Sequence, residues 1–188
     1  GVDAIHVSSG SFFPHPRNPA GELPIEELRK TYDTLISSGL LTKRNYLLFS
    51  GRLTSGYFQR QWDKGRGDIR HLEGMTLPDA HRIKQAVSIP VLCTGGFQTA
   101  TVIEQALADG LCHGVTIARP LIANNDLVKA FAAGAARAEK PCTYCNKCLV
   151  NAVENPLGCY EEARFASRDE MVRQIMSVFD PPPFSGGA

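Results

Sequence analysis

The sequence predicts an α/β fold built on a parallel sheet. Three short apolar segments have the composition of buried strands: one within residues 1–10, one at 89–94 and one at 113–118. The segments between them have the apolar periodicity of helices. Short apolar strands that alternate with helices are typical of a parallel α/β sheet.

The helices between the strands have recognisable ends. Residues 24–38 carry an apolar stripe and stop before Gly39, which suits a helix terminator. Residues 78–87 lead into the second strand, and residues 99–109 lead into the third. These segments are expected to be the covering helices of a βα repeat.

Two further helices follow the third strand. Asn124 or Asn125 is expected to cap a helix that runs to about Glu139. Ser167 and Glu170 have the spacing of a capping box, which predicts a last helix over 166–179.

Three strands cannot close a (β/α)₈ barrel, which takes roughly 250 residues. Because the chain opens within a predicted strand, without a methionine, we expect the C-terminal portion of a TIM barrel, about strands six to eight. We divide the chain into four parts: a partial barrel domain (1–140, with a long βα connection at 10–77), a cysteine-rich segment (141–165), the last helix (166–179) and a flexible tail (180–188).

The composition indicates a globular cytoplasmic protein with reduced thiols. The 43% of hydrophobic residues can build a core, and the formal charge of +1 argues against bulk binding of nucleic acid. No apolar run has the length of about 20 residues that a membrane helix needs, and no secretory signal opens the chain. Aromatic and basic residues interleave over 43–66, a pattern that also occurs in proteins that bind nucleic acid. We interpret this part instead as a substrate loop or solvated insertion with a small apolar cluster of its own.

Four cysteines form the most specific chemical pattern in the chain. They are Cys142, Cys145, Cys148 and Cys159. A triple run at intervals of three residues with a more distant fourth thiol favours an iron–sulfur cluster, whereas zinc sites more often use two separate Cys-x-x-Cys pairs. Cys93, Cys112 and His6 are expected to be core residues, and His15 is a weaker candidate for a substrate contact.

A phosphate site is predicted where two neighbouring strands end. Gly95 and Gly96 follow the second strand, and Ala118 and Arg119 follow the third. In TIM barrels a phosphate commonly sits at the loops after strands seven and eight, near the N-terminus of a short helix, where backbone N–H groups meet it. The side chain of Arg119 would add a charge-assisted contact. The alternative is a tight Gly-Gly turn beside a surface arginine.

Several of these segments resemble those of a known protein family. The run Val91-Leu92-Cys93-Thr94-Gly95-Gly96-Phe97, followed by residues 114–127, resembles the last two barrel strands of the Old Yellow Enzyme family of NADH:flavin oxidoreductases. The opening residues 5–10 are similar to its sixth strand. The four-cysteine run resembles the cluster-bearing branch that includes 2,4-dienoyl-CoA reductase and trimethylamine dehydrogenase. The resemblance covers roughly residues 1–165.

The resemblance implies a set of cofactor contacts. The backbone at Gly95, Gly96, Ala118 and Arg119, with the side chain of Arg119, would hold the FMN phosphate. Ser8 or Ser9 would touch the ribityl chain. The four cysteines would ligate a 4Fe-4S cluster. Ala118 departs from the family, which usually has glycine there, and a backbone contact tolerates this change.

The implied activity is transfer of hydride from NAD(P)H through FMN to an activated alkene or similar acceptor. The family's proton-transfer residues belong to the first five strands, so this chain alone is expected to be inactive and its catalytic residues lie elsewhere. The expected partners are a small-molecule substrate and a nicotinamide, and a homo-oligomer is compatible with the sequence. Two alternatives are a non-redox, metal-stapled module that binds a phosphate ligand, and a non-redox barrel enzyme that acts on a phosphorylated metabolite.

Overall fold

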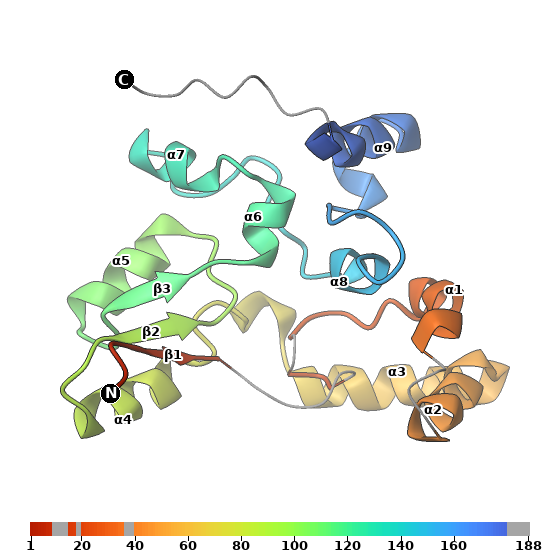
Figure 1. The fold of residues 1–188 in the computed structure, drawn as a ribbon, viewed down its shortest axis with the longest axis horizontal. Helices are drawn as coiled ribbons and strands as arrows, with labels where there is room; N and C mark the ends of the chain where they lie inside the picture. Colours follow the sequence, from red (N-terminus) through yellow and green to blue (C-terminus); the bar gives the residue numbers. More distant parts are fainter. Residues whose placement is uncertain (9–14, 18–19, 36–39, 180–188) are drawn as a thin grey trace.

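A small parallel sheet forms the first part of the fold. The computed structural model describes residues 1–8, 15–17, 20–35 and 40–179. Strands β1 (Ile5–Val7), β2 (Val91–Thr94) and β3 (Gly114–Thr116) are parallel and lie in this order (Figure 1). The predicted α/β class with a parallel sheet is confirmed, while the barrel stays a prediction.

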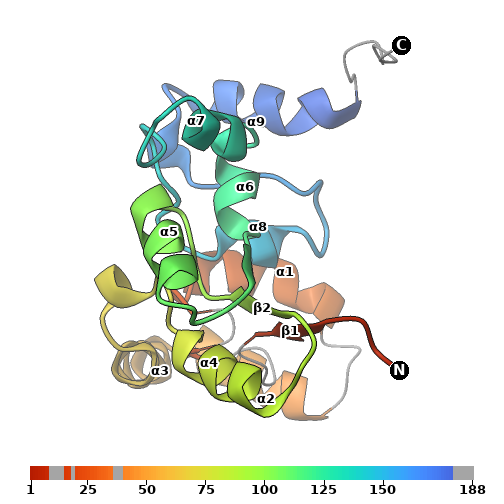
Figure 2. The ribbon, with the colours of Figure 1, turned by 90° about the vertical axis from the view of Figure 1, so that its left-hand side faces the viewer.

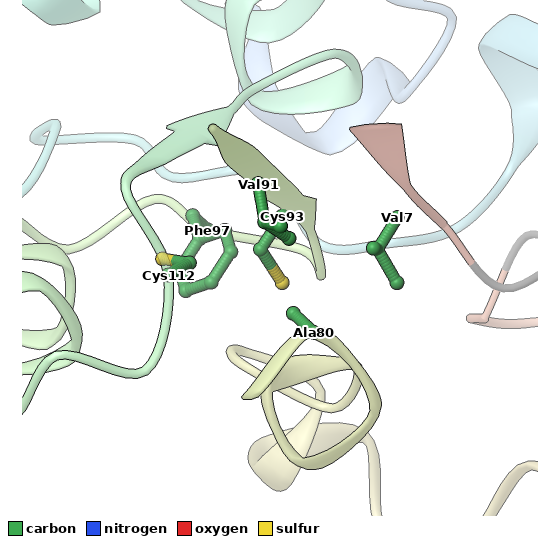
Figure 3. Packing of buried hydrophobic residues seen from close by; sticks show 6 residues of the cluster. All are labelled: Val7, Ala80, Val91, Cys93, Phe97 and Cys112. Atoms are coloured by element: carbon green, nitrogen blue, oxygen red, sulfur yellow. The ribbon is translucent and has the colours of Figure 1, made fainter. Parts of the chain in front are cut away.

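One face of the sheet packs against α4 (Leu77–Ala86) and α5 (Ala100–Ala108). Val7 and Cys93 are neighbours in the strand register, and both point toward Ala80 of α4 (Figure 3). Cys93 and Cys112 are both buried here, as predicted. The buried members of this core are Val7, Ala80, Val91, Cys93, Phe97 and Cys112.

The opposite face of the sheet carries a polar group of side chains. The ring Nε2 of His6 contacts the hydroxyls of Thr94 and Thr116, the latter at 2.8 Å. His6 itself is exposed, so its predicted place in the core is wrong. The cause is the alternation along β1, which turns Val7 toward the helices and His6 away from them.

Three helices form a second packed group, away from the sheet in Figure 1. They are α1 (Ile25–Leu35), α2 (Leu40–Ser50) and α3 (Arg52–Arg66). The predicted helix 24–38 is found as α1, and its last residues, 36–38, lie outside the described residues. Helices α2 and α3 also lie within the predicted βα connection over 10–77, and no helix was predicted for either of them. The apolar cluster predicted for this connection is present around buried Trp62.

The remaining helices follow β3. They are α6 (Arg119–Ala123), α7 (Leu127–Ala132), α8 (Lys147–Asn151) and α9 (Arg168–Met176), with single 3₁₀ turns at Glu162–Arg164 and Ser177–Phe179. Another 3₁₀ turn, Ile69–His71, lies earlier in the chain, between α3 and α4. Helix α8 lies beside α6 in both views (Figures 1 and 2). No helix in the described ranges combines the length and the apolar character needed to cross a bilayer.

The predicted helix from Asn124 or Asn125 to about Glu139 is wrong at both ends. Its N-cap is Asp126, and it stops at Ala132. Gly134 has φ +91°, and its N–H turns back to the carbonyl of Phe131, which ends the helix. The last helix agrees with the prediction: the side chain of Ser167 accepts the N–H of Glu170 at 3.2 Å. The predicted flexible tail lies outside the described residues.

Candidate functional site

The four predicted cysteines line one small cavity between α6, α8 and the turn at Glu162–Arg164. Cys145 and Cys148 are buried, and Cys142 and Cys159 are half-buried. The cavity encloses about 10 Å³. Its other walls come from Arg119, Ile122, Ala123, Thr143, Asn146, Tyr160, Glu161 and Arg164. The fold thus brings the distant fourth cysteine to the other three.

The thiols are spread around the cavity. Among the described residues, no three His, Cys, Asp or Glu side chains are close enough together to hold a single metal ion. A zinc ion draws its sulfur ligands to about 2.3 Å from one centre, whereas the thiolates of a cluster bind different irons.

Burial dominates the electrostatics of these thiols. It raises the pKa of Cys145 to about 12 and that of Cys148 to about 11, and it also raises the pKa of Cys142. The Arg119 guanidinium acts in the opposite direction on Cys142 and Cys148. At neutral pH these groups are therefore neutral thiols, and a metal that binds them must displace their protons.

Gln98 fixes the first cysteine to the loop that follows β2. This glutamine is 1% exposed. Its Nε2 donates to the carbonyl of Cys142 at 3.1 Å, and its Oε1 accepts the N–H of Cys142 at 2.9 Å. The side-chain amide of Gln98 thus bonds to both backbone groups of Cys142, as a neighbouring strand would, and fixes the cysteine segment to this loop.

Replacement of Gln98 by alanine is expected to destabilise the chain by about 1–3 kcal/mol, because two backbone groups of Cys142 lose their partners in a buried setting. Urea unfolding of the purified chain measures the change. Gln85→Ala is the control, because that side chain is exposed and, within the described part of the chain, bonds to His81 of the same helix. Equal midpoints for the two variants would contradict the role of Gln98.

Tyr144 makes a second link between the cysteine segment and the same loop. Its hydroxyl donates to the carbonyl of Gly96 at 2.5 Å, and its backbone N–H donates to the sulfur of Cys142 at 3.4 Å. Tyr144 and Asn146 both have positive φ, at +56° and +61°. These two left-handed residues flank Cys145 and bend the chain around the cavity.

The predicted phosphate residues lie at the carboxyl edge of the sheet. Gly95 and Gly96 follow β2, and Ala118 follows β3, whose last residue pairs with that of β2. Glycine at 95 is required by packing, since a Cβ there would stand 2.7 Å from the hydroxyl of Thr76. Gly96 has φ +70°. Exposed Ser8 follows β1 at this edge, and Ser9 lies outside the described residues.

The side chain of Arg119 has different partners from the predicted phosphate. Its Nη1 donates to the carbonyl of Ala20 at 2.6 Å and to Oδ1 of Asn146 at 2.5 Å. The guanidinium lies 5.3 Å from the ring centroid of Tyr144, within the range of a cation–π contact. In this structure Arg119 therefore connects the start of α6 to the cysteine segment.

Sequence reasoning missed four residues that build this site: Gln98, Tyr144, Asn146 and Arg164. Asn146 and Tyr144 lie inside the cysteine run, so that run itself could have drawn attention to them. Gln98 and Arg164 lie outside it, and nothing in their local sequence distinguishes them.

Comparison with known proteins finds reductases. The chain is similar to oxidoreductases. A bilirubin reductase from Mediterraneibacter gnavus is 39% identical over 74 residues, which are 39% of this chain and 12% of that protein. A 4,4'-dithiodibutanoate disulfide reductase from Rhodococcus erythropolis is 36% identical over 77 residues, 41% of this chain and 19% of that protein. A metal reductase from Desulforamulus reducens is 32% identical over 94 residues, 49% of this chain and 14% of that protein.

The matches cover less than a fifth of each of these relatives. No protein-family model matches the chain, and no solved structure matches it significantly. The three similarities support an oxidoreductase role in general terms, and they leave membership of the Old Yellow Enzyme family as a proposal.

Proposed function

We propose that the chain is the C-terminal part of an FMN-dependent reductase that also carries a 4Fe-4S cluster. The observation that carries the proposal is that four cysteines line one cavity. The segment that holds three of them is hydrogen-bonded to the loop after β2 through Gln98 and Tyr144. Electron exchange between a flavin and a cluster requires that the two groups lie near each other, and these bonds would bring a cluster close to a flavin phosphate at that loop. The similarity to three reductases supports the same chemistry.

The arrangement of the sheet supports a barrel. Three consecutive strands are parallel neighbours in sequence order, and α4 and α5 cover one face. A TIM barrel has this order and an outer ring of helices, whereas a doubly wound sheet has helices on both faces. In a barrel, the face that carries His6, Thr94 and Thr116 would turn inward.

The chain's own residues fit both groups. The sulfurs of the four cysteines would hold the cluster, and the guanidinium groups of Arg119 and Arg164 would offset its negative charge. The backbone at Gly95, Gly96, Ala118 and Arg119 would hold the phosphate of FMN at the edge of the sheet. When bound, FMN supplies hydride transfer from NAD(P)H to an activated alkene or similar acceptor, and the cluster supplies single-electron exchange.

The work of the described residues is to bind, position and exclude water. Gln98 and Tyr144 hold the cysteine segment against the proposed phosphate loop, which would fix the separation of the two groups when both are bound. Burial of Cys145 and Cys148 keeps solvent away from the ligand sulfurs. Residues that transfer protons to the substrate are proposed to belong to the preceding barrel strands.

An anaerobic absorption spectrum with iron and sulfide analysis tests the proposal on the full-length protein. We expect bound flavin and about four irons per chain. Cys145→Ser should lose most of the iron, while Cys112→Ala, which changes a buried cysteine of the sheet core, should keep it. Flavin without iron would contradict the cluster and leave the flavoenzyme, whereas neither flavin nor iron would contradict the proposal as a whole.

The second candidate is a non-redox, metal-stapled module that binds a phosphate ligand. The observation that favours it is that Gln98 and Tyr144 bond the cysteine segment to the loop after β2, so a metal held by the cysteines would lock these two segments together without any flavin. Such a module would contain zinc and no flavin. The same metal and flavin analysis therefore distinguishes the two functions.

A further inference from the structure

Arg164 lies against the fourth cysteine in a rigid setting. Its Nη1 donates to the sulfur of Cys159 at 3.0 Å. Its Nη2 is shared among three oxygens: the carbonyl of Ala123 at 2.9 Å, Oδ1 of Asn124 at 2.9 Å and the carbonyl of Lys140 at 2.6 Å. A guanidinium held from one side by three acceptors presents its other nitrogens in a fixed direction.

One N–H donor of the same guanidinium differs from the others. Its Nε is buried and has no hydrogen-bond partner among the described residues. Arg164 also lines the cysteine cavity. A buried donor without an acceptor is costly, and an anionic group in that cavity would give it one. The orphaned Nε therefore points to a ligand that carries negative charge.

Arg119 lines this cavity too, but it is used differently. Its Nη1 donates to the oxygens of Ala20 and Asn146, which join α6 to two other segments. The contact of Arg164 is instead with a sulfur of the proposed ligand set. The two arginines can thus be separated by experiment.

We propose that Arg164 is a positioning residue that raises the reduction potential of the cluster through its hydrogen bond to Cys159. The inference rests on the proposed cluster. Reduction adds negative charge to the cluster and its thiolates, so an N–H donor and a positive charge at a ligand sulfur stabilise the reduced form more than the oxidised form. The three oxygen acceptors hold the guanidinium in place for this task.

Redox titration of the full-length protein under anaerobic conditions tests the inference. Arg164→Gln should make the midpoint potential more negative by the equivalent of about tenfold in the reduction equilibrium, about 59 mV for one electron. Arg164→Lys should give a smaller shift, because it keeps the charge but loses the planar fork. Lys140→Met is the matched control: its Nζ donates to the carbonyl of Arg164, and it should keep the wild-type potential.

Iron content is measured before each titration. A wild-type potential in Arg164→Gln with full iron would overturn the inference. If both Arg164 variants lost iron while their circular dichroism stayed unchanged, the residue would serve assembly only, which also overturns it. If Arg164→Gln alone lost iron, a negative shift in Arg164→Lys would support the inference and a wild-type potential there would overturn it. Failure of the proposed function is distinguishable, because the wild-type protein would then already lack iron.

Discussion

Replacing Gly21 with alanine is expected to destabilise the chain by about 3 kcal/mol or more. Gly21 has φ +150°, a conformation that residues with a side chain rarely adopt. A Cβ at this position would stand 2.2 Å from the backbone oxygen of Tyr144 and 2.9 Å from Nδ2 of Asn146. Neither the backbone oxygen nor the buried asparagine can move without breaking other contacts, so the strain of the backbone and the overlap of atoms add.

Gly21 lies where the N-terminal segment crosses the cysteine segment. The N–H of Glu22 donates to the carbonyl of Tyr144 at 2.9 Å, and Nδ2 of Asn146 donates to the carbonyl of Glu22, also at 2.9 Å. Trp62 donates through Nε1 to the carbonyl of Gly21 at 2.8 Å. A Cβ at 21 would force these two segments apart and would weaken all three bonds.

Urea unfolding of the purified chain, followed by fluorescence, measures this effect. Trp62 is the only tryptophan in the chain, so its emission reports on the contact with Gly21 directly. Gly134→Ala is the matched control: Gly134 also has positive φ, but a Cβ there meets nothing within 4 Å. Gly134→Ala should cost about 1–3 kcal/mol from the backbone alone. Equal midpoints for the two variants would contradict the predicted collision.

The strands and their covering helices could be predicted because their signals are local. Each strand is a short apolar run, and α9 begins at a serine whose side chain caps it. Helices α2 and α3 were missed for a physical reason. Helix α2 has no apolar stripe, and α3 contains Gly56 and Gly65, which lower helix propensity. Its stability comes from tertiary packing of Trp62, which a local pattern does not reveal.

At the candidate site, too, the local features could be predicted from the sequence and the long-range contacts could not. The spacing of the cysteines is a local pattern, and the structure places all four around one cavity, while their role as cluster ligands stays a prediction. The contacts that hold them are not local: Gln98 bonds to Cys142, Arg119 bonds to Asn146, and Asn146 bonds to Glu22, far apart in the chain. No periodicity in the sequence encodes such pairs. Arg119 illustrates the limit, because its place at the strand end was predicted, yet its Nη1 bonds to Ala20 and Asn146.

Trp62→Ala is expected to cost about 3–5 kcal/mol, since truncation of a buried tryptophan loses its burial and leaves a cavity. Trp62 is 3% exposed and packs with Leu23, Leu28 and Val150. Urea unfolding followed by circular dichroism measures the change, because this variant has no tryptophan. Tyr57→Ala is the control on the same helix: Tyr57 is 64% exposed, and its loss should change stability by about 0.5 kcal/mol or less.

Trp62→Ala should also reach the cysteine site. Val150, one of its packing partners, belongs to α8, and α8 carries the buried ligand candidate Cys148. When α8 loses the packing of Trp62, it should open more often and expose that thiol. In chain prepared without iron, reaction with a thiol reagent should therefore be faster in Trp62→Ala than in Tyr57→Ala. A variant with lowered stability but an unchanged labelling rate would show that the apolar cluster supports α1 and α3 without controlling the position of α8.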